Sequence, residues 1–135
     1  MFYEIELKTS SRQEIIDITP EVYKIVEESE VSEGIAHIFV PHATAGIILN
    51  ESADPNIKKD FLNSLEKIIP LKANYLHDRI DGNASAHIKS ALVGSSLTIP
   101  IHQGKLYLGT WQAIMFCEFD GPRSKRKVVI QIIKG

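Results

Sequence analysis

The chain has 135 residues, of which 44% are hydrophobic and 24% are charged, and this composition is typical of a single globular domain. Its formal net charge is −2, so it lacks the basic excess that nucleic-acid binding requires. One cysteine, Cys117, excludes an internal disulfide and a zinc site made of several thiolates, and no apolar run is long enough to span a membrane. We expect one domain over residues 1–135, with neither nucleic acid nor membrane as a partner.

The first half of the chain predicts four strands and one helix. Alternating apolar and charged side chains in FYEIELK indicate a half-buried strand, and three further β-rich runs follow. Thr19 can cap a helix that has Pro20 in its first turn. The apolar stripe of this helix is Val22, Ile25 and Val26. The predicted strands cover residues 2–8, 14–19, 35–42 and 45–50.

The second half predicts two helices and then four strands. Asp54 and Pro55 start a helix that Pro70 ends, and Asn83 caps a third helix that stops at Gly94. The apolar side of the second helix is Ile57, Phe61, Leu65, Ile68 and Ile69. The predicted strands cover residues 96–102, 105–108, 111–119 and 126–133, and the first two form a hairpin through Gln103 and Gly104.

This order, mostly strands with three inserted helices, predicts an α+β domain with antiparallel or mixed sheets. The runs AIMFC and VVIQII are apolar on both faces, so each needs a helix, a second sheet or a neighbouring subunit on either side. Cys117 in the first run is expected to be a buried thiol. The N-terminal residues have the pattern of a strand and not of a signal peptide, so we expect a cytoplasmic protein.

Three histidines occupy the ends of predicted elements. His42 follows a strand in VPHATAG, whereas His77 and His87 flank the start of the third helix in NYLHDRIDGNASAHIKSA. Loops at element ends are where sites are assembled, and three imidazoles with one open position describe a catalytic site for zinc or a similar ion. The spacing matches no short metal motif, so histidines held by ordinary hydrogen bonds remain the alternative. His37 within a strand and His102 before a turn fit that alternative better.

Acidic side chains lie near two of these positions. LNESADP places Asn50, Glu51 and Asp54 at a strand-to-helix corner, where Asp54 can simply cap the helix. Glu51 has no such local role and could accept a proton or orient a ligating histidine. Asp78, beside His77, could do the same.

Cationic side chains could bind an anion. Arg79 lies between the two helix-flanking histidines, and DGPRSKRK, residues 120–127, is either a solvated hairpin turn or a flexible anion clamp around Arg123. The sequence contains no P-loop, no GxGxxG and no GxSxG, so common nucleotide-binding and acyl-hydrolase mechanisms have no support.

Several motifs together resemble one known family. PHATAGIILNE, the His77-Asp78 pair, AHIKSALVGSSLTIPI and GKLYLGTWQAI are similar to the secondary thiamine-phosphate synthase family of YjbQ-like proteins. The resemblance extends over about residues 2–134, and GTWQ at Gly109 to Gln112 is its most specific signature. It implies a compact α+β unit that assembles as a homotrimer.

The resemblance also implies a function and a site. The activity joins a hydroxymethylpyrimidine diphosphate to a thiazole phosphate and releases pyrophosphate. The implied residues are His42, His77 and His87 as ligands of a divalent metal, with zinc expected and magnesium as the alternative; Glu51, Asp54 and Asp78 as catalytic groups; and Asn50, Arg79, Trp111 and Gln112 as contacts of a phosphorylated small-molecule substrate.

Two other functions remain open at this point. Three histidines around a metal suit the activation of water equally well, so a metal-dependent hydrolase of a small phosphorylated or cyclic metabolite is an alternative. A non-enzymatic trimer that binds a small molecule is the other. A transferase that expels pyrophosphate more usually holds magnesium with carboxylates and phosphate oxygens, so both alternatives stay open.

Overall fold

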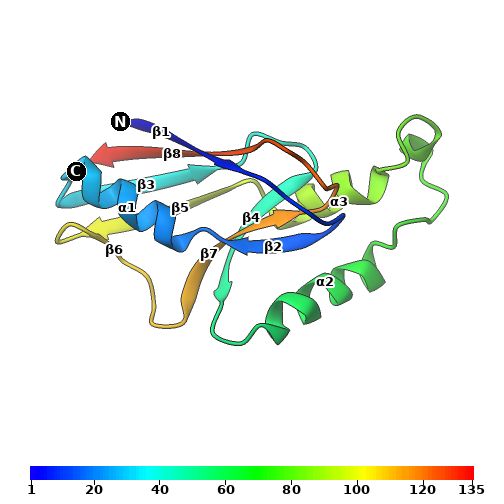
Figure 1. Cartoon of the computed structure of the whole chain (residues 1–135), viewed down its shortest axis with the longest axis horizontal. Coiled ribbons are helices and arrows are strands. Elements are labelled where there is room, and N and C mark those ends of the chain that lie inside the picture. The colour runs from blue at the N-terminus through cyan, green and yellow to red at the C-terminus, as the bar shows by residue number, and fades with distance from the viewer.

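Every strand in the computed structural model, which describes residues 1–135, belongs to one of two antiparallel sheets (Figure 1). A five-stranded sheet has the order β1-β8-β3-β5-β6, and a three-stranded sheet has the order β2-β7-β4. All six strand pairings are antiparallel, so the predicted α+β class is confirmed with antiparallel sheets. The strands are β1 (Phe2–Leu7), β2 (Glu14–Asp17), β3 (Glu33–Phe39), β4 (Ala45–Glu51), β5 (Ser96–His102), β6 (Lys105–Leu106), β7 (Gln112–Glu118) and β8 (Arg126–Lys134).

The three predicted helices are present, and a short 3₁₀ turn was not predicted. The helical elements are α1 (Thr19–Ser29), α2 (Asn56–Ile68), the 3₁₀ turn η1 (Leu76–Arg79) and α3 (Ala84–Val93). The apolar stripe of α1 lies in the main core between the two sheets, whereas α2 and α3 pack on the other face of the small sheet. None of these helices is long and apolar enough to cross a membrane.

β7 is the central strand of the small sheet and is buried on both faces, as predicted. Ile114 and Phe116 point into the main core, while the alternating residues Met115 and Cys117 pack under α2 and α3. Burial raises the pKa of the Cys117 thiol to about 12, so this cysteine is the inert buried thiol that the sequence indicated.

β8 is covered on only one face. Val128, Ile130 and Ile132 lie in the main core, but Ile133 is 52% exposed. The apolar pairs Ile35↔Ile133 and Phe39↔Val129 continue this outer face across β3. Within one chain neither a helix nor a second sheet covers this face of β8, so cover by a neighbouring subunit stays a prediction. The face is partly polar, because His37 pairs with Gln131 between the two apolar pairs.

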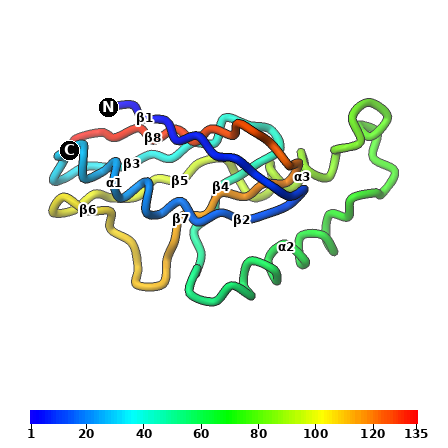
Figure 2. The backbone as a smooth tube through the Cα atoms, viewed as in Figure 1, coloured from blue at the N-terminus to red at the C-terminus, as the bar shows by residue number.

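Two further local predictions need correction. Thr19 does not cap α1, because its Oγ1 instead accepts a hydrogen bond of 2.8 Å from the Ile114 N–H, and the Asp17 carboxylate accepts the Thr19 N–H. The last turn of α2 does not bury Ile68, which is 69% exposed. The hairpin through Gln103 and Gly104 is confirmed, although its second strand, β6, has only two residues. The two chain ends lie together at one end of the large sheet (Figure 2), where the N-terminal ammonium donates to the Ile132 carbonyl.

One buried ion pair ties the sheets and their loops together. The Arg126 guanidinium at the start of β8 donates two hydrogen bonds to the Glu118 carboxylate at the end of β7, and both side chains are almost fully buried. The same carboxylate accepts the hydroxyl of Thr9 at 2.7 Å, and Arg126 also donates to Thr44 Oγ1 at 2.9 Å. Burial alone would raise the pKa of Glu118, but Arg126 and these hydrogen bonds outweigh it and hold the pKa below its ordinary value.

Replacing Glu118 by Gln should strongly destabilise the fold, because it leaves the Arg126 charge buried without a counter-ion. We expect the free energy of unfolding to fall by about 3 kcal/mol or more, measured by urea denaturation. The control is Glu4→Gln, which breaks an exposed pair of 3.7 Å with Lys127 and should cost less than about 1 kcal/mol. Equal stabilities for the two variants would contradict this assignment.

Candidate functional site

The fold brings His77 and His87 into contact. His77 lies on η1 and His87 on α3, and their ring centroids are 4.7 Å apart with an interplanar angle of 72°. Asp78 holds the two elements together, because its Oδ1 accepts the N–H of Ala84 at the start of α3 at 3.0 Å. Asn83 was predicted to cap α3, but the side chain that accepts the N–H at the helix start is that of Asp78. A catalytic role for Asp78 stays a prediction.

His42 lies in the loop that joins β3 to β4. His42 and His87 line the same pocket of about 330 Å³. Since His87 also contacts His77, all three histidines are gathered around α3 although they are far apart in the sequence. The other residues that line this pocket are Ala43, Ser90, Ala91, Gly94 and Ser95.

His42 is held as a neutral imidazole. Its Nε2 accepts the backbone N–H of Lys127 at 2.8 Å, so in the neutral ring the proton is on Nδ1. Burial, together with the nearby positive charge of Arg126, lowers the pKa of His42 below its ordinary value of 6.5. Protonation of Nε2 would break the contact with Lys127.

The titration of His42 should follow from this environment. We expect its NMR-monitored midpoint below pH 6.5, with the signal assigned by comparison with His42→Phe. The unfolded chain then takes up this proton at higher pH than the folded chain does, so the free energy of unfolding should decrease as the pH falls below 6.5. A midpoint at or above 6.5 would contradict the proposed burial and charge effects.

The two contacting histidines fit a metal ion better than His42 does. The Nε2 atom of His77 is buried and has no hydrogen-bond partner; the nearest acid is Asp81, with an Oδ2 at 3.7 Å. A buried polar atom without a partner is costly and commonly marks a ligand position. His42 could join His77 and His87 only by releasing the Lys127 N–H. No group of three or more histidine, cysteine or acidic side chains is arranged to hold a metal ion.

The second buried polar atom without a hydrogen-bond partner belongs to Asn83, whose contact with Asp120 was not predicted from the sequence. Asn83 donates from Nδ2 to Asp120 Oδ2 at 3.0 Å, while its Oδ1 is buried and has no partner. The same oxygen of Asp120 accepts a hydrogen bond of 2.9 Å from Arg123. Arg123 is therefore paired within its own turn, which favours the structural interpretation of DGPRSKRK over the anion clamp.

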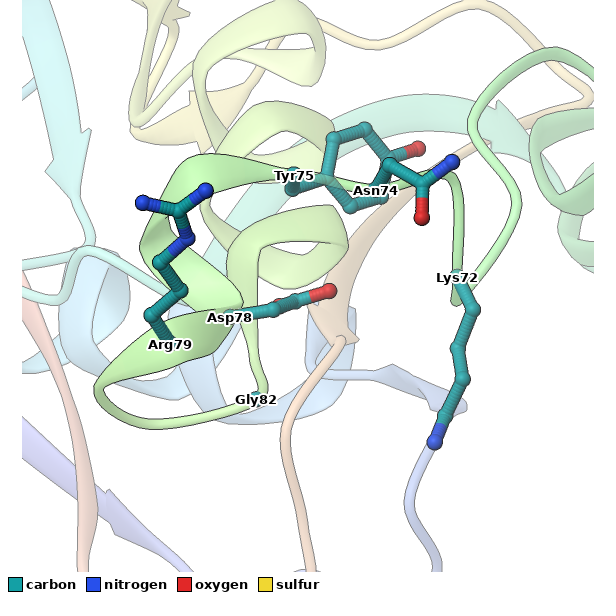
Figure 3. Close-up of a pocket in the computed structure, with 6 residues that line it drawn as sticks. All are labelled: Lys72, Asn74, Tyr75, Asp78, Arg79 and Gly82. Atoms are coloured by element: carbon teal, nitrogen blue, oxygen red, sulfur yellow. The ribbon is translucent and has the colours of Figure 1, made fainter.

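Arg79 lines a separate pocket of about 400 Å³ beside η1 (Figure 3). In Figure 3 the side chains of Lys72 and Arg79 extend away from the Asp78 carboxylate in different directions, and neither cation belongs to an ion pair of the chain. The pocket thus carries two free positive charges and one carboxylate that is already hydrogen-bonded. The remaining lining residues are Asn74, Tyr75 and Gly82.

The other predicted site residues lie at the opposite end of the small sheet. Glu51 pairs with Gln112 at the last position of β4, and Trp111 beside them is 68% exposed. The seven residues of β4 rise about 3.3 Å each, which separates Glu51 from the histidine end of this strand by roughly 20 Å. Within one chain, therefore, the structure does not bring these residues to the histidines.

Two of the polar residues at this end have local hydrogen bonds. Asp54 Oδ1 accepts the Asn56 N–H at 2.9 Å, but the N-cap residue of α2 is Pro55. Asp54 therefore supports the start of the helix from one residue before its cap, and a catalytic role stays a prediction. Asn50 Oδ1 accepts the N–H of Glu51 at 2.7 Å.

Comparison with known proteins decides the family. The sequence model of a family described as UPF0047 protein YjbQ-like matches residues 3–135. The chain belongs to this family. The UPF0047 protein of Methanocaldococcus jannaschii is 51% identical over 133 residues, covering 98% of this chain and 94% of that protein. The UPF0047 protein YugU of Bacillus subtilis is 46% identical and covers 93% and 94% of the two chains.

Crystal structures of YjbQ-like proteins share the fold. A YjbQ-like protein of unknown function from Sulfolobus solfataricus superposes with a TM-score of 0.97 at 37% identity, covering 100% of this chain and 97% of that one. A family member from Clostridium acetobutylicum gives 0.93 at 53% identity, covering 97% and 99%. Nothing in these matches links the chain to thiamine-phosphate synthesis, so that activity stays a prediction.

Proposed function

We propose that this YjbQ-like protein is a metal-binding enzyme for a phosphorylated small molecule, with thiamine-phosphate synthase-like activity. The observation that carries the proposal is the buried, unpartnered Nε2 of His77 against the ring of His87. His77 and His87 would hold zinc, and His42 would join them once it releases the Lys127 N–H. Magnesium, the alternative ion, prefers oxygen ligands and would depend on the phosphate oxygens of the substrate. A divalent ion at this place would stabilise the negative charge of a departing diphosphate.

The chemistry would proceed by displacement at one carbon atom. The thiazole nitrogen attacks the methylene carbon of the pyrimidine diphosphate, the carbon–oxygen bond breaks, and pyrophosphate leaves with the bonding electrons. The chain's own contribution is to bind and orient the reactants. The free cations Lys72 and Arg79 beside η1 are suited to the phosphate groups, and the neutral His42 can donate a hydrogen bond from Nδ1.

A metal-dependent hydrolase remains the second candidate, because the same histidine pair could bind a metal that activates water. A purely binding function is the third. All three share the histidine pocket and differ only in whether the bound molecule is transferred, hydrolysed or retained.

We include the homotrimer in the proposal. The uncovered outer face of the large sheet supports it, since Phe2, Ile35, Phe39 and Ile133 are exposed on strands that pair side by side. An apolar patch of this kind marks an association surface, and a second copy of the chain is its simplest occupant.

Metal binding can be tested on the purified protein. Elemental analysis and zinc titration should give stoichiometric binding to the wild type and at least a tenfold loss of affinity in His87→Ala. The matched control is His102→Ala, which removes an exposed histidine paired with Glu33 and should leave affinity unchanged. Equal zinc affinity in the two variants, or no metal binding by the wild type, would contradict the proposed metal site.

The reaction can be tested with the metal-loaded protein and both substrates. Formation of thiamine phosphate with stoichiometric release of pyrophosphate is expected, and His87→Ala should reduce it at least a hundredfold. Release of inorganic phosphate from either substrate alone would instead favour the hydrolase. Binding of a substrate without any turnover would favour the non-enzymatic function.

A further inference from the structure

The two buried polar atoms without a hydrogen-bond partner belong to one junction of the chain. His77 Nε2 lies on η1, and Asn83 Oδ1 belongs to the residue that directly precedes α3. The Asp78 carboxylate joins η1 to α3 at this place by accepting the N–H of Ala84. The backbone carbonyl of Asn83 accepts the N–H of His87, whose ring contacts that of His77. The junction therefore combines two contacting imidazoles with two buried atoms whose bonding capacity is unused.

Two charged side chains fix the orientation of the Asn83 amide. A carboxylate only accepts hydrogen bonds, so Asp120 has to face the amide nitrogen of Asn83, and its Oδ2 accepts Nδ2–H at 3.0 Å. Arg123 holds Asp120 in turn, by donating 2.9 Å hydrogen bonds to its Oδ2 and to its backbone carbonyl. The Asn83 oxygen is thereby directed away from Asp120, and it is buried instead of reaching water.

A divalent ion would satisfy both unpartnered atoms of the junction at once. Buried polar atoms are nearly always paired, and His77 Nε2 and Asn83 Oδ1 form no hydrogen bond with each other. A neutral imidazole nitrogen and an amide oxygen both carry lone pairs, and both are common metal ligands in proteins. The combination therefore points to a cation and not to a second hydrogen-bonding side chain.

We propose that Asn83 is a further ligand of the divalent ion, with its Oδ1 bound to the ion beside His77 and His87. This inference rests on the proposed function, because it takes the two contacting histidines as the metal site. Asn83 needs no rearrangement to release its oxygen. His42 differs in this respect, because it has to give up the Lys127 N–H before it can bind.

An amide oxygen among the ligands changes which ions the site accepts. Imidazole nitrogens suit zinc, whereas carbonyl oxygens suit manganese and magnesium. The mixed set is expected to bind Zn²⁺ and Mn²⁺, and the loss of its oxygen should weaken Mn²⁺ binding more than Zn²⁺ binding. Asp120 and Arg123 act as positioning residues, because they hold the Asn83 amide and do not contact the ion.

Calorimetric titration of the metal-free protein with each ion tests this ligand. Loss of a residue that only supports a ligand commonly weakens metal binding by about tenfold or more, so Asn83→Ala should raise the Mn²⁺ dissociation constant at least that much. The rise should be smaller for Zn²⁺. The matched control is Asn63→Ala, which removes an exposed amide on α2 and should change neither constant. Wild-type affinity of Asn83→Ala for both ions would overturn the proposal and leave a buried water molecule as the partner of Oδ1.

An exchange of two side chains separates ligation from support of the fold. In Asn83→Asp/Asp120→Asn the hydrogen bond between the two positions is kept with its direction reversed, and the net charge is unchanged. A carboxylate oxygen then replaces the amide oxygen at the ion, and a charged ligand binds a divalent ion more tightly. The exchanged protein should therefore bind Mn²⁺ more tightly than the wild type. Affinity equal to that of the wild type, or lower, would show that Asn83 serves only the hydrogen bond to Asp120.

The spectrum of bound Co²⁺ gives a readout that depends on neither stability nor turnover. Its visible bands follow the coordination geometry, so Asn83→Ala should change them and Asn63→Ala should not. Zinc binding that depends on His87 but not on Asn83 would overturn this inference and leave the proposed metal site intact. Absence of metal binding by the wild type would remove both.

Discussion

The buried Glu118–Arg126 pair is the constraint on which the rest of the arrangement depends. It joins the end of β7 to the start of β8, and so fixes the small sheet against the large one. Through Thr44 it also fixes the loop that carries His42. Removing two charges from water is expensive, and the cost is offset here by at least four hydrogen bonds in a fixed geometry. The position of His42 therefore depends on the buried ion pair that also stabilises the fold.

β4 has the opposite effect, because it keeps chemically active residues apart. Its first residues adjoin the histidine pocket and its last residue is Glu51, so a strand of this length separates the two sets of residues. Short strands are rigid, and no loop of the chain can shorten that separation. The division of polar residues between two ends of one small sheet is therefore a fixed property of the single chain.

Much of the fold could be predicted from local pattern. Alternation identified β1, the stripe at Val22, Ile25 and Val26 identified α1, and Gly94 marked the end of α3. Hydrophobic periodicity predicts these elements well because residues close together in the sequence usually belong to the same helix or strand. The cap of α1 was misplaced because Thr19 meets the Ile114 N–H, a partner 95 residues away that no local pattern reveals.

Less of the site could be predicted, because its residues come from segments that are far apart in the sequence. The positions of the histidines at element ends indicated that His77 and His87 could meet, and they do. No local pattern indicated that Asn83 would pair with Asp120. Glu51 and Trp111 were grouped with the histidines only because of the family resemblance. Spacing along the sequence does not tell which residues of different strands lie at the same end of a sheet. The covered or open state of β8 likewise depends on what lies outside the chain.

The cap formed by Asp78 has a consequence for how substitutions near the histidines should be interpreted. Because this carboxylate accepts the N–H of Ala84 in the first turn of α3, it joins η1 to α3 and helps to set the spacing between the two rings. Removing the Asp78 carboxylate would allow the two imidazole rings to move apart. The resulting loss of activity would resemble the loss caused by removing a catalytic group. The substitution Asp78→Asn keeps an oxygen that can accept the Ala84 N–H but removes the negative charge, so it distinguishes a capping role from a role in the reaction.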